Sequence, residues 1–89
     1  MKGVYEDHTE LFKKLPYIAG TNCMGCYPHH HESIELIMFK EKSTLYLGGD
    51  VYYMNQGELA VISPDVIHAV SIEKNASYDF IIVSSRFCA

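Results

Sequence analysis

Two observations in the sequence predict an all-β fold, a small antiparallel barrel or sandwich. Short apolar or alternating segments follow one another at close spacing, separated by turn residues such as Gly48-Gly49-Asp50. Three histidines and one glutamate also fall in or beside these segments: His29, His31, Glu35 and His68. Imidazole and carboxylate are ligand types that suit transition metals. The expected structure is therefore a small barrel with a polar or metal-binding interior.

The predicted elements run in order from a short helix to a series of strands. Residues 6–15 predict the helix, because acidic residues lie at its start, Lys13 and Lys14 lie at its end, and Pro16 stops it. The segments after Pro16 show the apolar or alternating pattern of strands. The predicted strands are 17–19, 34–39, 44–47, 51–54, 59–62, 67–72 and 78–83.

Turn residues justify the boundaries between these strands. The turns are the charged segment 40–43, the hairpin signal 48–50, the segments 55–57 and 63–65, and the polar loop 73–77. Hairpin connections of this kind favour antiparallel pairing. The last strand, 78–83, is almost entirely apolar, as expected for a strand buried on both faces.

Composition restricts the chain to a few classes. With 89 residues it is expected to form one domain, 1–89, and its 48% of hydrophobic residues suffices for a core. The net charge is −4, and the largest basic cluster is the pair Lys13-Lys14, so direct contact with nucleic acid is not expected. No apolar run reaches the ~18 residues that span a membrane, and no signal-peptide pattern opens the chain. We expect a cytoplasmic protein.

The spacing of the histidines predicts which of them act together. Residues two apart in a strand face the same side, so His29 and His31 converge while His30 points away. A straight strand would carry Glu35 about 13 Å beyond His31, too far to share a metal. The chain is therefore expected to bend between them, at 32–33. His68 shares its parity with Val70 and is expected to face the interior. Ordinary surface or hydrogen-bonded core histidines remain the alternative.

Two other groups of residues are candidates for a functional site. Cys23-Met24-Gly25-Cys26 is half of a zinc or redox motif, but the three cysteines (the third is Cys88) are best explained as ordinary thiols of a reducing compartment. Tyr46, Tyr52 and Tyr53 are candidates to line a ligand pocket, because an aromatic ring combines apolar area with a polar tip. Neither a phosphate-binding loop nor a hydrolase triad is present in the sequence.

These motifs resemble a known superfamily. The pattern from His29 through His31 to Glu35 resembles the first motif of the cupins, and the stretch from Gly57 to His68 resembles the second. The closer resemblance is to the N-terminal sensor domains of AraC-family transcriptional regulators. It covers about 28–87, and within it the stretch 45–61 aligns without gaps.

The chain departs from the cupin pattern in three places. The turn 40–43 lacks the usual glycine and is one residue short, Asp65 stands where glycine is usual, and no asparagine follows His68. The turn at Asp65 must therefore tolerate a non-glycine backbone. These three departures weigh against a catalytic cupin, although all four ligand positions of the family are filled.

The resemblance implies a cupin-type barrel of the jelly-roll kind that senses a small-molecule effector, forms a homodimer and can hold one divalent metal ion (Zn, Ni, Fe, Mn or Cu) at the four ligand positions. As AraC-type regulators contact DNA through a separate C-terminal half, the chain is either an excised sensor domain or a natural short cupin. Two alternatives remain open: a small metal-dependent enzyme of the oxygenase or isomerase class, and a binding-only barrel for a small metabolite.

Overall fold

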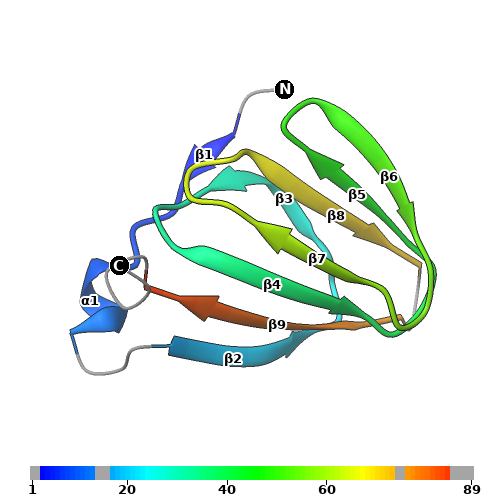
Figure 1. Cartoon of the computed structure of the whole chain (residues 1–89), viewed down its shortest axis with the longest axis horizontal. Helices are drawn as coiled ribbons and strands as arrows, with labels where there is room; N and C mark the ends of the chain where they lie inside the picture. Colours follow the sequence, from blue (N-terminus) through cyan, green and yellow to red (C-terminus); the bar gives the residue numbers. More distant parts are fainter. Residues whose placement is uncertain (1–2, 14–16, 74–75, 85–89) are drawn as a thin grey trace.

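The computed structural model describes residues 3–13, 17–73 and 76–84, which form two β-sheets and one turn of helix (Figure 1). The all-β prediction is confirmed. No helix in these ranges is long and apolar enough to cross a membrane. In chain order the elements are β1 (Val4–Tyr5), α1 (Thr9–Phe12), β2 (Tyr17–Asn22), β3 (Cys26–His30), β4 (Ile34–Phe39), β5 (Ser43–Leu47), β6 (Asp50–Met54), β7 (Leu59–Ile62), β8 (His68–Ile72) and β9 (Tyr78–Val83).

From β1 to β9 the chain changes sheet at every connection except the hairpin that joins β5 and β6 within one sheet. One sheet has the order β1-β3-β8-β5-β6 and the other the order β2-β9-β4-β7. Every pairing among the described strands is antiparallel, as predicted, except that β1 runs parallel to β3. Because β3 and β8 lie in one sheet and β4 in the other, residues from both sheets can meet between them (Figure 1).

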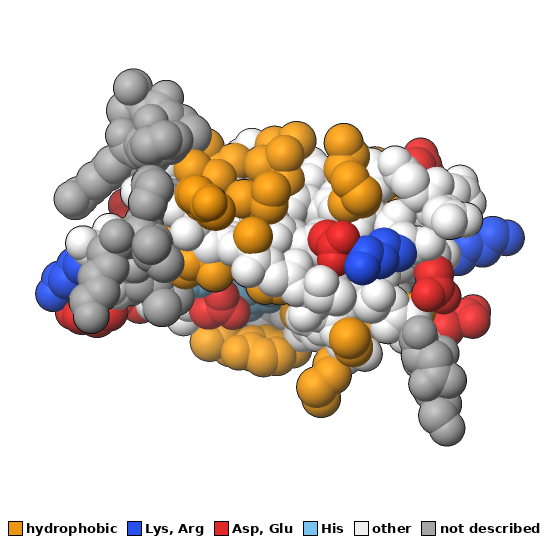
Figure 2. Space-filling view, turned by 90° about the horizontal axis from the view of Figure 1, so that it is seen from below, with side chains coloured by type: hydrophobic (Ala, Val, Ile, Leu, Met, Phe, Trp, Pro, Cys, Tyr) orange, Lys and Arg blue, Asp and Glu red, His pale blue; other side chains and the backbone are white. Residues whose placement is uncertain are grey.

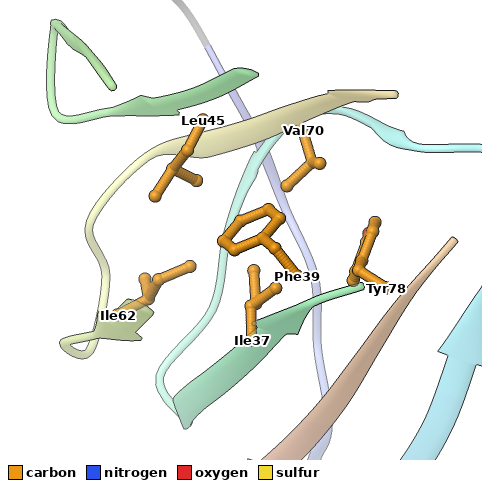
Figure 3. Packing of buried hydrophobic residues seen from close by; sticks show 6 residues of the cluster. All are labelled: Ile37, Phe39, Leu45, Ile62, Val70 and Tyr78. Atoms are coloured by element: carbon orange, nitrogen blue, oxygen red, sulfur yellow. The ribbon is translucent and has the colours of Figure 1, made fainter. Parts of the chain in front are cut away.

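The core lies between the sheets and follows the alternation of side chains along each strand. Ile37 and Phe39 on β4 are fully buried, and the residue two before them, Glu35, has the same parity and is also buried. Figure 3 shows that the buried hydrophobic side chains of five strands meet in one cluster: Ile37, Phe39, Leu45, Ile62, Val70 and Tyr78. The parity that builds the core thus also directs a carboxylate into the interior.

The N-terminal region differs from its prediction. The helix is one turn, Thr9–Phe12, in place of 6–15, and the predicted stop at 14–16 lies outside the described residues. The carboxylate of Asp7 accepts hydrogen bonds from the N–H and the hydroxyl of Thr9, which fixes a bend where the helix was expected to begin. Residues before this bend form β1, a strand of two residues that was not predicted.

The second strand is longer than predicted. β2 extends to Asn22 because it pairs with β9 along its whole length, and Thr21 donates a hydrogen bond to the Asp79 carboxylate across the pair (2.7 Å). Tertiary pairing therefore continues the strand through Gly20, where local propensity predicts an end.

Candidate metal centre

Three histidines and one glutamate converge between the two sheets. His29, His31, Glu35 and His68 each offer one ligand atom, and all four atoms lie within 4.8 Å of one another. All four residues are buried, His68 completely. The structure thus brings together the four residues that the sequence spacing singled out.

A bend between β3 and β4 brings His31 and Glu35 together. The chain bends at Glu32 and Ser33 and crosses from one sheet to the other. The bend lies at the position that was predicted from the distance between His31 and Glu35. His31 Nε2 then lies 2.9 Å from Glu35 Oε1. His30, the intervening histidine, faces away from the centre as expected, and its Nδ1 lies 3.3 Å from an Asp65 carboxylate oxygen.

His68 reaches the centre because β8 pairs with β3. The register places His68 directly opposite His29, and their ring centroids are 4.1 Å apart. The preceding turn is closed by the Asp65 N–H, which donates to the carbonyl of His31 at 2.6 Å. Asp65 has a φ of 59°, the only positive φ of a non-glycine residue in the described ranges. The turn therefore does adopt the backbone that usually calls for glycine.

Backbone carbonyls fix the orientation of all three rings. The Nδ1 atoms of His29, His31 and His68 lie 2.9, 3.0 and 2.9 Å from three carbonyl oxygens. Those oxygens belong to Tyr27, Ser33 and Val66, each two residues from its histidine. Because a carbonyl only accepts, each Nδ1 must carry the proton and donate it. Each Nε2 is thereby left for the centre, the tautomer in which histidine binds a metal.

Glu35 joins two of these rings. Its Oε1 lies 2.9 Å from His31 Nε2 and 3.3 Å from His68 Nε2. Burial alone would raise the pKa of Glu35, but the hydrogen bonds from His31 and His68 outweigh it and lower the pKa to about 2. Burial likewise opposes protonation of His31, yet the adjacent carboxylate raises the pKa of that ring. His29, which has no such bond to Glu35, has its pKa lowered by burial.

The donor set fits a divalent transition metal. With metal–nitrogen and metal–oxygen distances of about 2.1 Å, two ligands of one ion lie at most about 4.2 Å apart, so the 4.8 Å spread needs only a small contraction. Three Nε2 lone pairs facing one carboxylate would repel it unless a proton or a cation lies between them. Nitrogen and oxygen donors of this kind suit iron, manganese, cobalt, nickel, copper or zinc.

Two further residues surround the centre, and the sequence analysis missed them. Glu6 Oε2 lies 3.7 Å from His29 Nε2, and Glu6 Oε1 lies 2.8 Å from His8 Nε2. His8 is buried, bonds to Ser33 Oγ (2.8 Å) and stacks on His31 at a centroid distance of 4.7 Å. Both residues lie in the segment 6–15 that was predicted as a helix, so the only signal for the centre was one more histidine with an acid two residues away.

An open cavity of about 300 Å³ lies beside this pair. Its wall combines aromatic, hydroxyl and charged side chains from the N-terminal segment and from the bend before β4: Tyr5, His8, Thr9, Phe12, Glu32 and Ser33. His8 and Ser33 belong both to this wall and to the hydrogen bonds around His31. The cavity is thus adjacent to the metal centre, with His8 between them.

The three tyrosines considered for a ligand pocket do not share one face. Tyr52 pairs with the buried Leu45 and so shares the inner side of the sheet, whereas Tyr46 and Tyr53 have the opposite parity. Tyr53 is 81% exposed and Tyr52 46%. A pocket that involves these residues stays a prediction.

The two described cysteines lie apart from the four-residue group. Cys23 is exposed before β3, and Cys26 is half-buried at its start. Burial raises the pKa of the Cys26 thiol. Neither belongs to the group of convergent ligand atoms, and their interpretation as ordinary thiols stays a prediction.

The fold is that of the cupins. An RmlC-like cupin from Shewanella frigidimarina superposes with a TM-score of 0.69 at 14% identity, covering 80% of this chain and 68% of the other. A Cupin 2 conserved barrel domain protein from Salinispora arenicola gives 0.65 at 13% identity (81% and 66%), and KdgF from Halomonas sp. gives 0.63 at 18% (84% and 76%). No protein-family model and no curated protein matches the sequence.

Proposed function

We propose that this cupin-fold domain holds one divalent transition metal at His29, His31, Glu35 and His68. The observation that carries the proposal is the arrangement of the three rings. Each Nδ1–H is bound to a backbone carbonyl, so each Nε2 is aimed at one point that Glu35 also faces. A bound metal would supply a Lewis acid and coordination positions for a small molecule.

Metal analysis of single variants tests this proposal. Purified protein loaded with Co²⁺ or Zn²⁺ and dialysed is expected to retain about one ion per chain. His31→Ala removes one of the four ligands and is expected to lose most of that metal. His30→Ala is the matched control, because His30 lies next in the chain, faces away from the centre and is partly exposed.

A result in which His31→Ala retains as much metal as the unaltered chain would reject the four-residue assignment. Equal loss in His30→Ala would show that the effect comes from general damage to β3. Circular dichroism of both variants establishes that the strands are still formed.

Beyond metal binding, we propose that the domain senses a small molecule on behalf of an AraC-type regulator. The resemblance of 45–61 to those sensor domains supports this proposal. The departures from the cupin pattern at the turns 40–43 and 65 support it as well, because they weigh against a catalytic cupin. The cavity of about 300 Å³ beside the centre offers room for a small metabolite with polar groups. The acidic net charge of −4 is consistent with leaving DNA contact to another domain.

The competing function is a small metal-dependent enzyme, and the intact four-ligand set favours it. The two candidates differ in what happens to the ligand. A sensor gains thermal stability from its ligand without consuming it, whereas an enzyme converts it in a metal-dependent manner. Screening sugars and carboxylic acids by thermal shift, followed by product analysis of each stabilising compound, separates the two: turnover that disappears with the metal would establish the enzyme.

A further inference from the structure

We propose that Glu6 supplies a fifth ligand to the metal and that His8 positions it. This inference rests on the proposed metal binding, which it extends to a residue outside both histidine motifs. It assigns to the N-terminal segment a direct part in the metal centre.

The first argument is distance. Glu6 Oε2 lies 3.7 Å from His29 Nε2, within the separation of about 4.2 Å that two ligands of one ion can span. His31 and His68 both direct their Nε2 atoms at Glu35. Within the described part of the chain, Glu6 is the carboxylate that lies within 4.0 Å of His29 Nε2. The centre therefore has one carboxylate for two of its rings and another for the third.

The second argument is that Glu6 is held in place at both its backbone and its side chain. Its N–H donates to the carbonyl of His30 at 2.8 Å, which continues the parallel pairing of β1 with β3. His8 binds Oε1 of Glu6 through Nε2 and Ser33 Oγ through Nδ1, both at 2.8 Å. With Oε1 bound to His8, Oε2 is the oxygen left to face the centre. Such outer contacts orient metal ligands in known sites.

The third argument is charge. Three neutral imidazoles and Glu35 give the centre a charge of −1, and Glu6 makes it −2, which matches a divalent cation. A matched charge matters because an unbalanced ion is costly to bury. Five protein ligands also exceed the four of a tetrahedral zinc site. The set therefore favours ions that accept six ligands, such as Fe²⁺, Mn²⁺, Co²⁺ or Ni²⁺, with one position left for exchange.

Cobalt binding by the full chain tests the proposal. Co²⁺ is added to metal-free protein, its affinity is measured by competition with a chelator, and its visible absorption bands report the ligands directly. Glu6→Gln keeps the size and hydrogen-bonding shape of the side chain but removes a charged ligand oxygen. The expected result is an affinity at least about tenfold lower together with shifted absorption bands.

Glu10→Gln is the control, because Glu10 is a nearby exposed acid on α1 that pairs with Lys13. Its affinity is expected to stay within about twofold of the unaltered chain, with the same spectrum. His8→Gln is expected to lower the affinity less than Glu6→Gln, since it removes the group that holds the ligand while leaving the ligand itself.

The outcomes separate this inference from the function on which it rests. If Glu6→Gln binds Co²⁺ with unchanged affinity and spectrum while His31→Ala does not bind, the metal centre stands and Glu6 is only a structural partner of His8. If the affinity falls but the bands stay unchanged, Glu6 acts through its charge alone, and the proposal of ligation is overturned. If the unaltered chain does not bind Co²⁺, the proposed function fails as well. Should Glu6→Gln not fold, Glu6→Ala must show the same band shift.

Discussion

Glu35 is a carboxylate on an otherwise apolar strand, and its surroundings explain how it is accommodated there. The Nε2 atoms of His31 and His68 lie 2.9 and 3.3 Å from its Oε1, and these contacts lower its pKa to about 2 in spite of burial. The folded protein therefore binds this proton more weakly than the unfolded chain. The contribution of Glu35 to stability is fully present above its ordinary pKa of 4.5 and is lost as the pH falls towards 2.

The first prediction follows from the lowered pKa of Glu35. Metal-free protein is expected to lose unfolding free energy between about pH 5 and pH 2, with on the order of 3 kcal/mol of the loss due to Glu35. Urea titrations at several pH values measure the loss, and Glu35→Gln should have a shallower acid slope. An identical slope in the variant would contradict the assigned coupling. The acid range is the informative one, because the pKa of His31 is raised and that of His29 lowered, so their effects near pH 6.5 oppose each other.

Asp65 gives a second prediction at the scale of one residue. Its φ of 59° lies in the left-handed region, which costs a side chain with a Cβ about 1 kcal/mol unless local hydrogen bonds compensate. Asp65→Gly is expected to leave the unfolding free energy unchanged or slightly higher, since the contact with His30 is exposed and weak. Asp65→Val should lower it by more than 1 kcal/mol. Thermal unfolding compares the two, and equal stability of both variants would count against strain in this turn.

At the scale of the element, β4 divides its residues between core and surface. Ile37 is fully buried and Met38, the next residue, is 46% exposed on the outer side of the same strand. Ile37→Ala is expected to cost about 3 kcal/mol, because it leaves a cavity in the core, whereas Met38→Ala should cost less than about 1 kcal/mol. Denaturant unfolding measures both, and comparable losses would refute the assigned facing of the strand.

The same strand illustrates what the sequence predicts well. Alternation and turn residues located β4, β5, β6, β7 and β9 to within a residue or so, because these signals are local. The parity of His29, His31 and His68 also predicted correctly which side chains converge, since a strand repeats every two residues.

What the sequence could not predict depends on contacts between distant segments. β1 has two residues and forms only because β3 lies beside it, so no local pattern marks it or the approach of Glu6 to His29. The carbonyl partners of the three Nδ1 atoms depend on the course of the backbone at each bend.

For the molecule as a whole, the outer face of the sheet β2-β9-β4-β7 carries an apolar patch on β4, β7 and β9, which is bordered by Asp79. Its pairs place Met38 beside Leu59, and Val61 and Ile81 on either side of Leu36. Met38, Leu59, Val61 and Ile81 are between 43% and 62% exposed. Hydrophobic side chains also gather on the surface in Figure 2. A contiguous apolar face on a small domain is typical of a protein contact.

We predict that two copies of the chain associate through this face. Val61→Lys is expected to shift the protein towards the monomer, because it places a charge at the centre of the contact. Tyr53→Lys on β6, in the other sheet, is the control and should leave the association unchanged. Sedimentation over a range of concentrations measures both. A clean monomer for the unaltered chain at high concentration would exclude the dimer.

The four residues proposed as metal ligands come from both sheets, and this has a consequence for how the molecule opens. His29 and His68 belong to one sheet and Glu35 to the other, and Glu35 and His68 are 33 residues apart in the chain. An ion bound to all of them would act as a cross-link that closes a long loop and holds the two sheets together. Its presence would govern the rate at which the layers separate. A cell that withdraws the ion would therefore shorten the lifetime of the folded domain and make metal supply a control on the amount of protein.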